Sequence, residues 1–259
     1  MANKVRFLIS SNLDSASLSV SSTSSGLPVT NLQDKLIRKV YRTGGQYTEY
    51  VVFDAAAATA IDMLFIGGLN LTKNATVLWQ GHTSDSWGSP ALNTTLTIAT
   101  DTQGNALSYV AHFYSSVKEY RYWRLVVNDG SNATSSLNVG RVMGGRAIEP
   151  TRNLREGFAL DVIDPSRFRQ TAGRQGYANT RSSYRTMSYS VFNVGETQQD
   201  ELLGIYAEVG QHTALVVALD PETRPQHNTM YCQFMTPLNR RHRVLRQMDI
   251  DQIQFEEKN

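Results

Sequence analysis

Three short stretches near the start of the chain decide its fold. Residues 27–32 read LPVTNL, residues 38–45 read RKVYRTGG, and residues 61–70 read IDMLFIGGLN. The first two stretches combine turn-forming residues with basic side chains, which is typical of a structured loop with an exposed, positively charged tip. An apolar run that ends at Asp54, and then residues 61–67, have the composition of β-strands. This region therefore predicts a loop that leads into a pair of strands.

Strand-forming runs continue through the first 150 residues and alternate with turn residues. The clearest run is YRYWRLVV at residues 120–127, where successive side chains would point to opposite faces of a sheet. Arg124 would share one face with Tyr122, and Trp123 would lie on the other face. Strands are expected at residues 5–11, 16–22, 47–54, 60–67, 75–81, 95–100, 120–128 and 137–143.

The character of the sequence changes at residues 140–150, where a glycine pair and Pro150 mark a boundary. We expect two domains, residues 1–148 and residues 149–259. In the second domain, residues 196–209 carry an apolar stripe, acids in the first turns and a following Gly210, which together predict a helix. Strands are expected at residues 157–163, 184–194, 214–219, 230–235 and 248–255.

Residues 166–183 are rich in arginine, glycine and glutamine and show no apolar periodicity. They predict a long basic loop or an extended arm. The expected fold class is therefore mainly β. The family resemblance given below implies an N-terminal β-sandwich, followed by a β-domain with one flanking helix.

The loop and strand stretches quoted above, with the run at 120–127, resemble the galactose-binding-like (discoidin-like) β-sandwich found in tail proteins of long-tailed bacteriophages. The order of elements in the second domain, with the run from residue 210 to 234, resembles distal-tail and tail-tube-like domains. The resemblance implies a structural protein of the virion tail tip, made in the host cytoplasm, that forms a homo-oligomeric ring. Such a ring would join the tail tube to the hub and fibre proteins of the baseplate, and DNA would pass only as cargo of the lumen.

Composition limits the remaining possibilities. Apolar residues make up 41% of the chain and charged residues 19%, as in ordinary globular proteins. No run reaches the roughly 20 apolar residues of a membrane span, and the N-terminal apolar run is too short for a secretory signal, so no membrane partner is expected. The single cysteine, Cys232, lies in an apolar run and is expected to be a buried thiol.

The sequence offers little for catalysis. The five histidines are far apart and show no metal-ligand spacing, and no nucleophile elbow, phosphate-binding loop or dinucleotide fingerprint is present. Asp54 with Asp62, and Asp161 with Asp164, could form carboxylate pairs, but aspartates at strand ends are more often turn formers. We expect no enzyme activity, no catalytic residues, no metal and no cofactor.

A carbohydrate-binding module for host-surface recognition is the alternative function. In the resembled fold, loops at one end of the sandwich contact sugars, and Tyr41, Arg42 and Trp87 are the candidate glycan-facing residues here. Aromatic faces stack on sugar rings, and arginine donates hydrogen bonds to hydroxyl or carboxylate groups. Trp79 is expected in the core instead. Calcium held by Asp85 or Asp101 stays an open alternative.

The basic segment has three interpretations: an arm that lies on a neighbouring subunit, a DNA contact, or a disordered loop. The first predicts an interface in which arginines pair with the acidic C-terminal run of the neighbour. Its candidate residues are Arg167, Arg169, Arg174 and Arg181 on the arm, and Asp249, Asp251, Glu256 and Glu257 on the receiving surface.

Overall fold

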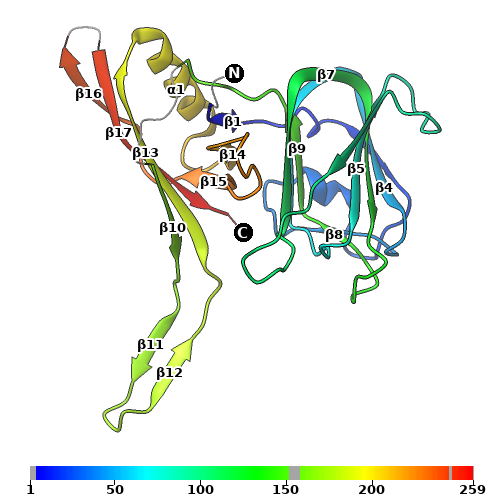
Figure 1. Cartoon of the computed structure of the whole chain (residues 1–259), viewed down its shortest axis with the longest axis horizontal. Helices are drawn as coiled ribbons and strands as arrows, with labels where there is room; N and C mark the ends of the chain where they lie inside the picture. The colour runs from blue at the N-terminus through cyan, green and yellow to red at the C-terminus, as the bar shows by residue number, and fades with distance from the viewer. Residues whose placement is uncertain (1–3, 152–157, 245–246, 259) are drawn as a thin grey trace. The chain divides into compact units, whose positions relative to one another are not determined.

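A computed structural model describes residues 4–151, 158–244 and 247–258 (Figure 1). The chain divides into two compact units. Unit 1 is Met1–Glu149 with Leu215–Met230, and unit 2 is Pro150–Ala214 with Tyr231–Asn259. The expected domain limits, 1–148 and 149–259, stay a prediction. The division differs from them in placing Leu215–Met230 with the first unit.

Unit 1 is built almost entirely of antiparallel strands. A six-stranded sheet has the order β2-β4-β7-β5-β6, and β9 pairs with β4. β3 and β8 form a two-stranded sheet, and β1 pairs with β14 as the first two strands of a second, seven-stranded sheet. The strands are β1 Arg6–Leu8, β2 Ser17–Val20, β3 Tyr41–Arg42, β4 Glu49–Gly67, β5 Thr76–His82, β6 Leu92–Leu96, β7 Tyr109–Asn128, β8 Asn138–Val139, β9 Arg141–Gly145 and β14 Leu215–Ala218.

Two long strands turn this sheet into a sandwich. The first part of β4 pairs with the end of β7, and the second part of β4 pairs with the start of β7 and with β9. Between the two parts the register shifts from Asp54 to Thr59, and Ala56 has a left-handed φ of 63°. Such an irregularity bends a strand, and β7 arches over in Figure 1. The sheet therefore curls on itself, and the expected β-sandwich is confirmed.

Aromatic side chains fill the space between the layers. Trp79 and Trp123 are fully buried and stack with ring centroids 5.7 Å apart, and Phe53 lies 5.8 Å from Trp79. The prediction that Trp79 belongs to the core is confirmed. These large rings remove much apolar surface from water, which is the main favourable term in folding.

The stretch LPVTNL forms the 3-10 helix Val29–Gln33, and its Leu32 is fully buried. Gln33 Nε2 donates to the carbonyl oxygens of Leu13 and Ala16, both at 2.8 Å. In the basic stretch that follows, Arg38 and Lys39 are exposed, as expected, whereas Tyr41 and Thr43 are buried. Further on, Gly68 has a φ of 71°, and a Cβ there would lie 2.8 Å from the Cα of Gly140, so this turn requires glycine.

Unit 2 pairs an antiparallel sheet with one helix. The sheet has the order β15-β17-β13-β10, and β16 pairs with β17. Its elements are β10 Ala159–Ile163, β11 Arg167–Gln170, β12 Gly176–Asn179, β13 Tyr184–Val194, α1 Glu196–Val209, β15 Thr229–Phe234, β16 Asn239–Val244 and β17 Gln247–Glu257. Most of β15 belongs to this unit.

The expected helix is confirmed with its limits, as α1. Leu202, Ile205 and Val209 are buried, and the ring of Tyr206 meets that of Phe234 edge to face with centroids 5.2 Å apart. Gly210, with a φ of 55°, ends the helix. Within the described residues, no helix is long and apolar enough to cross a membrane.

The basic segment is ordered, and the expectation of a long loop is wrong in this respect. Residues 166–183 contain the two-stranded hairpin β11–β12, with Arg167 opposite Asn179 and Arg169 opposite Tyr177. Arginine alternates with Phe168 and Gln170 on β11, and β12 is made of small and polar residues with one tyrosine, so neither strand has a run of apolar residues that a sequence pattern could detect. The strand β16 was missed for the same reason, because its residues are mostly basic.

Candidate functional site

A row of polar side chains crosses three neighbouring strands of unit 1. Asn93 on β6, Gln80 on β5 and Arg124 on β7 are paired in register, so they lie side by side on the sheet. Gln80 Nε2 donates to Asn93 Oδ1 at 3.0 Å, and Arg124 Nε donates to Gln80 Oε1 at 2.7 Å. The two amides therefore hold the guanidinium group of Arg124 in one orientation.

Two aromatic rings flank this guanidinium group. Its carbon lies 4.4 Å from the ring centroid of Trp87 and 5.7 Å from that of Tyr50. Trp87 comes from the loop between β5 and β6, and its Nε1 donates to Asp85 Oδ1 at 2.6 Å. Trp87 is half-buried, and Tyr50 is 38% exposed. We call these residues, Tyr50, Gln80, Trp87, Asn93 and Arg124, the Arg124 face.

The terminal nitrogens of Arg124 are available to a ligand. Within the described residues, its hydrogen bond to Gln80 uses Nε alone, and no partner is recorded for the two Nη groups. Partial burial lowers the pKa of Arg124 from its usual value, yet a guanidinium stays protonated at any physiological pH. The Arg124 face thus offers fixed, charged donors beside two partly exposed rings.

The structure separates the three residues expected to face a glycan. Trp87 belongs to the Arg124 face. Tyr41 is wrong for this role, because its side chain is only 1% exposed and its hydroxyl donates to the carbonyl oxygen of Ser22 at 2.5 Å. Arg42 lies beside it on β3, where Nε donates to Asn138 Oδ1 at 2.8 Å.

Tyr50, Gln80 and Asn93 are not among the site residues predicted from the sequence. Nothing in their local pattern marks them, because their role depends on strand pairing between distant segments. Arg124 was placed on a sheet face with Tyr122 in the strand YRYWRLVV, and that motif was the available signal.

The expected arm residues are all on the surface. Arg167 and Arg169 lie on β11, Arg174 lies in the turn with a φ of 61°, and Arg181 follows β12. All four are exposed. Within the described residues, no side-chain ion pair is recorded for any of them.

The expected receiving acids are less available. Glu257 Oε1 lies 2.5 Å from Arg185 Nη2, and both side chains are largely buried, so this carboxylate is neutralised within its own chain. Glu256 Oε1 lies 2.9 Å from Lys258 Nζ. Asp249 is half-buried and has an interaction of its own, and the side chain of Asp251 lies outside the described residues. The acidic C-terminal run is therefore a poor receiving surface.

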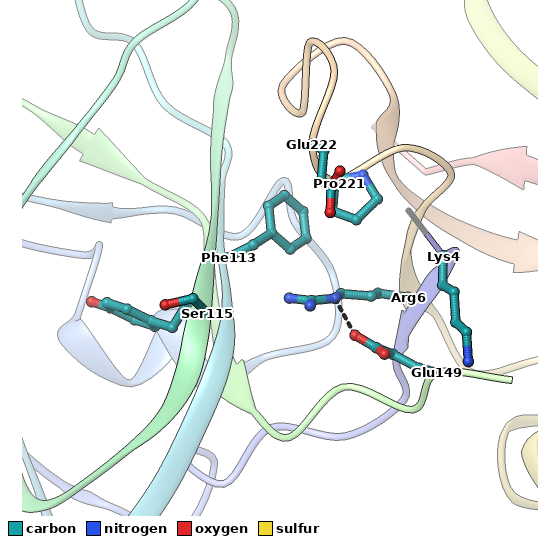
Figure 2. A pocket seen from close by; sticks show the side chains of 8 residues that line it. Lys4, Arg6, Phe113, Ser115, Glu149, Pro221 and Glu222 are labelled. Atoms are coloured by element: carbon teal, nitrogen blue, oxygen red, sulfur yellow. Dashed lines mark ion pairs between the residues drawn. The ribbon is translucent and has the colours of Figure 1, made fainter. Parts of the chain in front are cut away.

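A small cavity of about 190 Å³ opens beside Phe113 in unit 1 (Figure 2). The side chain of Arg6 reaches into it, with Nε 2.6 Å from Glu149 Oε1 and the guanidinium carbon 5.9 Å from the Phe113 ring centroid. Lys4 and Glu222 also line it. The volume is below the 300–1,000 Å³ or so of small-molecule sites, and the arginine is already paired, so this cavity is a weaker candidate.

A second cavity, of about 480 Å³, shares Phe113 and Pro221 with the first. One wall is fixed, because Gln226 Nε2 donates to the carbonyl oxygen of Ala111 while its Oε1 accepts from the Ala111 N–H. Burial lowers the pKa of His112 in this wall and favours its neutral form. The cavity has the size of a ligand site, but the amide of Gln226 is already used on the Ala111 backbone.

The carboxylates considered for catalysis have structural partners. Asp54 accepts from Arg121 Nε at 2.8 Å and Nη2 at 2.9 Å, while Asp62 accepts from the Ala147 N–H at 2.7 Å. Asp164 Oδ1 accepts from the Ser166 N–H at 2.8 Å, as in a turn. Among the described residues, no group of histidine, cysteine or acidic side chains could hold a metal ion. Cys232 is a buried thiol outside any disulfide, as expected.

No protein-family model and no curated protein matches this chain. Several solved carbohydrate-binding domains are similar to part of it. The lectin domain of lectinolysin, solved with Lewis b antigen, is 16% identical, with 53% of this chain and 97% of that domain covered and a TM-score of 0.41. A fucose-binding module of Streptococcus pneumoniae is 10% identical, with 53% and 98% covered and a TM-score of 0.43.

The CBM32 module of AlyQ, solved with 4,5-unsaturated mannuronic acid, is 13% identical, with 49% of this chain and 92% of the module covered and a TM-score of 0.37. All three are carbohydrate-binding proteins by name. At these levels the likeness does not extend to function, which depends on this chain's own side chains. The expected mainly β fold class is confirmed by the structure, with a β-sandwich in the first unit.

Proposed function

We propose that unit 1 is a carbohydrate-binding module that acts without catalysis. One observation carries the proposal: Arg124 is held by Gln80 between the rings of Trp87 and Tyr50, with its Nη groups left to a ligand. Aromatic faces pack against the C–H groups of a sugar ring, and fixed N–H donors bind hydroxyl or carboxylate oxygens. Because the donors are already oriented, little conformational entropy is lost when a ligand binds.

Binding to a glycan array, followed by calorimetry with the best glycan, tests this function. Trp87→Ala and Arg124→Met should each weaken binding by about 30-fold, the equivalent of roughly 2 kcal/mol at a contact that dominates affinity. Tyr47→Ala is the matched control, since Tyr47 is 67% exposed on the same unit but is not part of the Arg124 face. Failure of the folded protein to bind any glycan would contradict the proposal, as would equal binding by the control and both variants.

A second function is favoured by a separate observation in unit 2. We propose that the chain is also a structural component that assembles with copies of itself, because every residue of β11 and β12 is exposed. An isolated two-stranded hairpin is at best marginally stable in water, so a partner surface is expected to cover it. Phe168 and Tyr177, 69% and 70% exposed, are the kind of side chains that interfaces bury.

The resemblance to phage tail proteins suggests where this assembly would act. In the proposal, the chain forms a ring at the virion tail tip that joins the tail tube to hub and fibre proteins, with DNA only passing through. Negative-stain microscopy and sedimentation of the purified protein test it: closed rings of one size are expected. A monomer at every concentration and salt would contradict the assembly function and leave the glycan-binding proposal standing.

A further inference from the structure

The hairpin β11–β12 has one basic face. In an antiparallel pair, directly opposed residues share a face, so Arg167, Arg169, Tyr177 and Asn179 lie together. The other face is occupied locally, because the ring of Phe168 lies over Gly176, where a Cβ would come within 2.7 Å of it. Residues 166–183 contain four arginines and no acid. The hairpin therefore offers positive charge around an exposed tyrosine.

The helix α1 offers the opposite charge. It holds four acids and no lysine or arginine. Glu196, Asp200 and Glu208 are exposed, together with Gly204 between them, and these positions are four residues apart along one side of the helix. Within the described residues, no ion pair is recorded for these three acids. The fourth acid, Glu201, is used locally, since it accepts from the Thr151 N–H at 3.1 Å.

The two surfaces belong to the same unit but lie at opposite ends of one strand. The hairpin precedes Tyr184, the first residue of β13, and α1 follows Val194, the last. At about 3.3 Å per residue, the strand separates them by roughly 35 Å, and Figure 1 shows the hairpin pointing away from α1. The hairpin of one copy thus cannot reach its own helix and is free to reach that of another.

We propose that the basic face of the hairpin docks on the acidic side of α1 in a second copy of this chain. The inference rests on the assembly function proposed above and names its contact. Arg167 and Arg169 approach Asp200 and Glu208, and Tyr177 covers the small surface at Gly204. Because the two surfaces differ, the contact is head to tail, and repetition closes a ring or extends a filament.

Two charge-reversal variants and their mixture test the docking. The hairpin variant is Arg167→Glu with Arg169→Glu, and the helix variant is Asp200→Arg with Glu208→Arg. Glu196 is left in place because an acid stabilises a helix N-terminus. Sedimentation at about 0.01 M salt, where the screening length is about 30 Å, should show assembly of the wild type and at least tenfold weaker self-association of each variant. Equal parts of the two variants should assemble together, since each then meets its opposite charge.

The control variant is Glu119→Arg with Glu222→Arg, which makes the same change in charge as the helix variant at exposed positions of unit 1. It should assemble as the wild type does, and circular dichroism should show all variants folded.

Assembly of both reversal variants at wild-type strength would overturn the docking while leaving assembly itself intact. A hairpin variant that still assembles but no longer binds duplex DNA would overturn it in favour of nucleic-acid contact. A monomeric wild type would overturn the docking and the assembly function together.

Discussion

Two segments of this chain, residues 27–45 and residues 166–183, each carry four basic residues but differ in how they are held. The first is fastened to the sandwich by buried Leu32 and by Gln33, which bonds two backbone carbonyls. The second has no buried residue on either strand of its hairpin. Buried Leu32 and Tyr41, together with the amide of Gln33, thus make the first segment part of its own core, whereas the second is an arm that needs another surface.

The largest expected effect lies in the core to which the first segment is fastened. Trp123→Ala should destabilise the protein by about 3–5 kcal/mol, because it empties the space beside Trp79 and Phe53. Tyr177→Ala in the hairpin should change stability by no more than about 0.5 kcal/mol, since Tyr177 is exposed. Thermal and urea denaturation of both variants measure the contrast. A large loss of stability in Tyr177→Ala would mean that the hairpin packs within its own chain.

The next largest effect is the loss of stability when a glutamine is replaced in each of the two segments. Gln33→Ala removes both Nε2 hydrogen bonds, so the Ala16 carbonyl loses this donor and the Leu13 carbonyl keeps only the Ala16 N–H; the change should cost about 1–3 kcal/mol. Gln170→Ala removes only an exposed contact to the Arg174 carbonyl and should be close to neutral. Urea denaturation of the two variants measures the difference. Equal stabilities would mean that Gln33 does not fasten its segment to the sandwich.

The smallest effect concerns pH. The hydrogen bonds from Arg121, aided by the Ala56 N–H, lower the pKa of Asp54 to about 2 from 3.8. A carboxyl with a depressed folded pKa stabilises the fold above its unfolded pKa, and the contribution is lost as the pH falls toward 2. The stability difference between wild type and Asp54→Asn should therefore shrink between about pH 4 and pH 2. A difference that stays constant over that range would mean that the pair with Arg121 does not form in solution.

Local pattern was enough to predict the helix and most of the strands with an apolar face, while the sandwich was predicted from the family resemblance and the polar strands β11, β12 and β16 were missed. The run YRYWRLVV and residues 196–209 are the clearest cases of such a local pattern. The Arg124 face could not be predicted in full, since Gln80 and Asn93 meet Arg124 only after strands β5, β6 and β7 are paired. Tyr41 was misplaced because a tyrosine beside arginine in a turn-rich stretch looks exposed, whereas its ring fills the sandwich.

Hydrogen–deuterium exchange at several protein concentrations tests the contrast between the two regions most directly. Amides of β4 and β7 should be protected at every concentration, because they lie in the centre of the sheet. Amides of β11 and β12 should exchange quickly in dilute protein and become protected as copies associate. Strong protection of the hairpin in dilute monomer would contradict the account, as would fast exchange at concentrations where the protein is assembled.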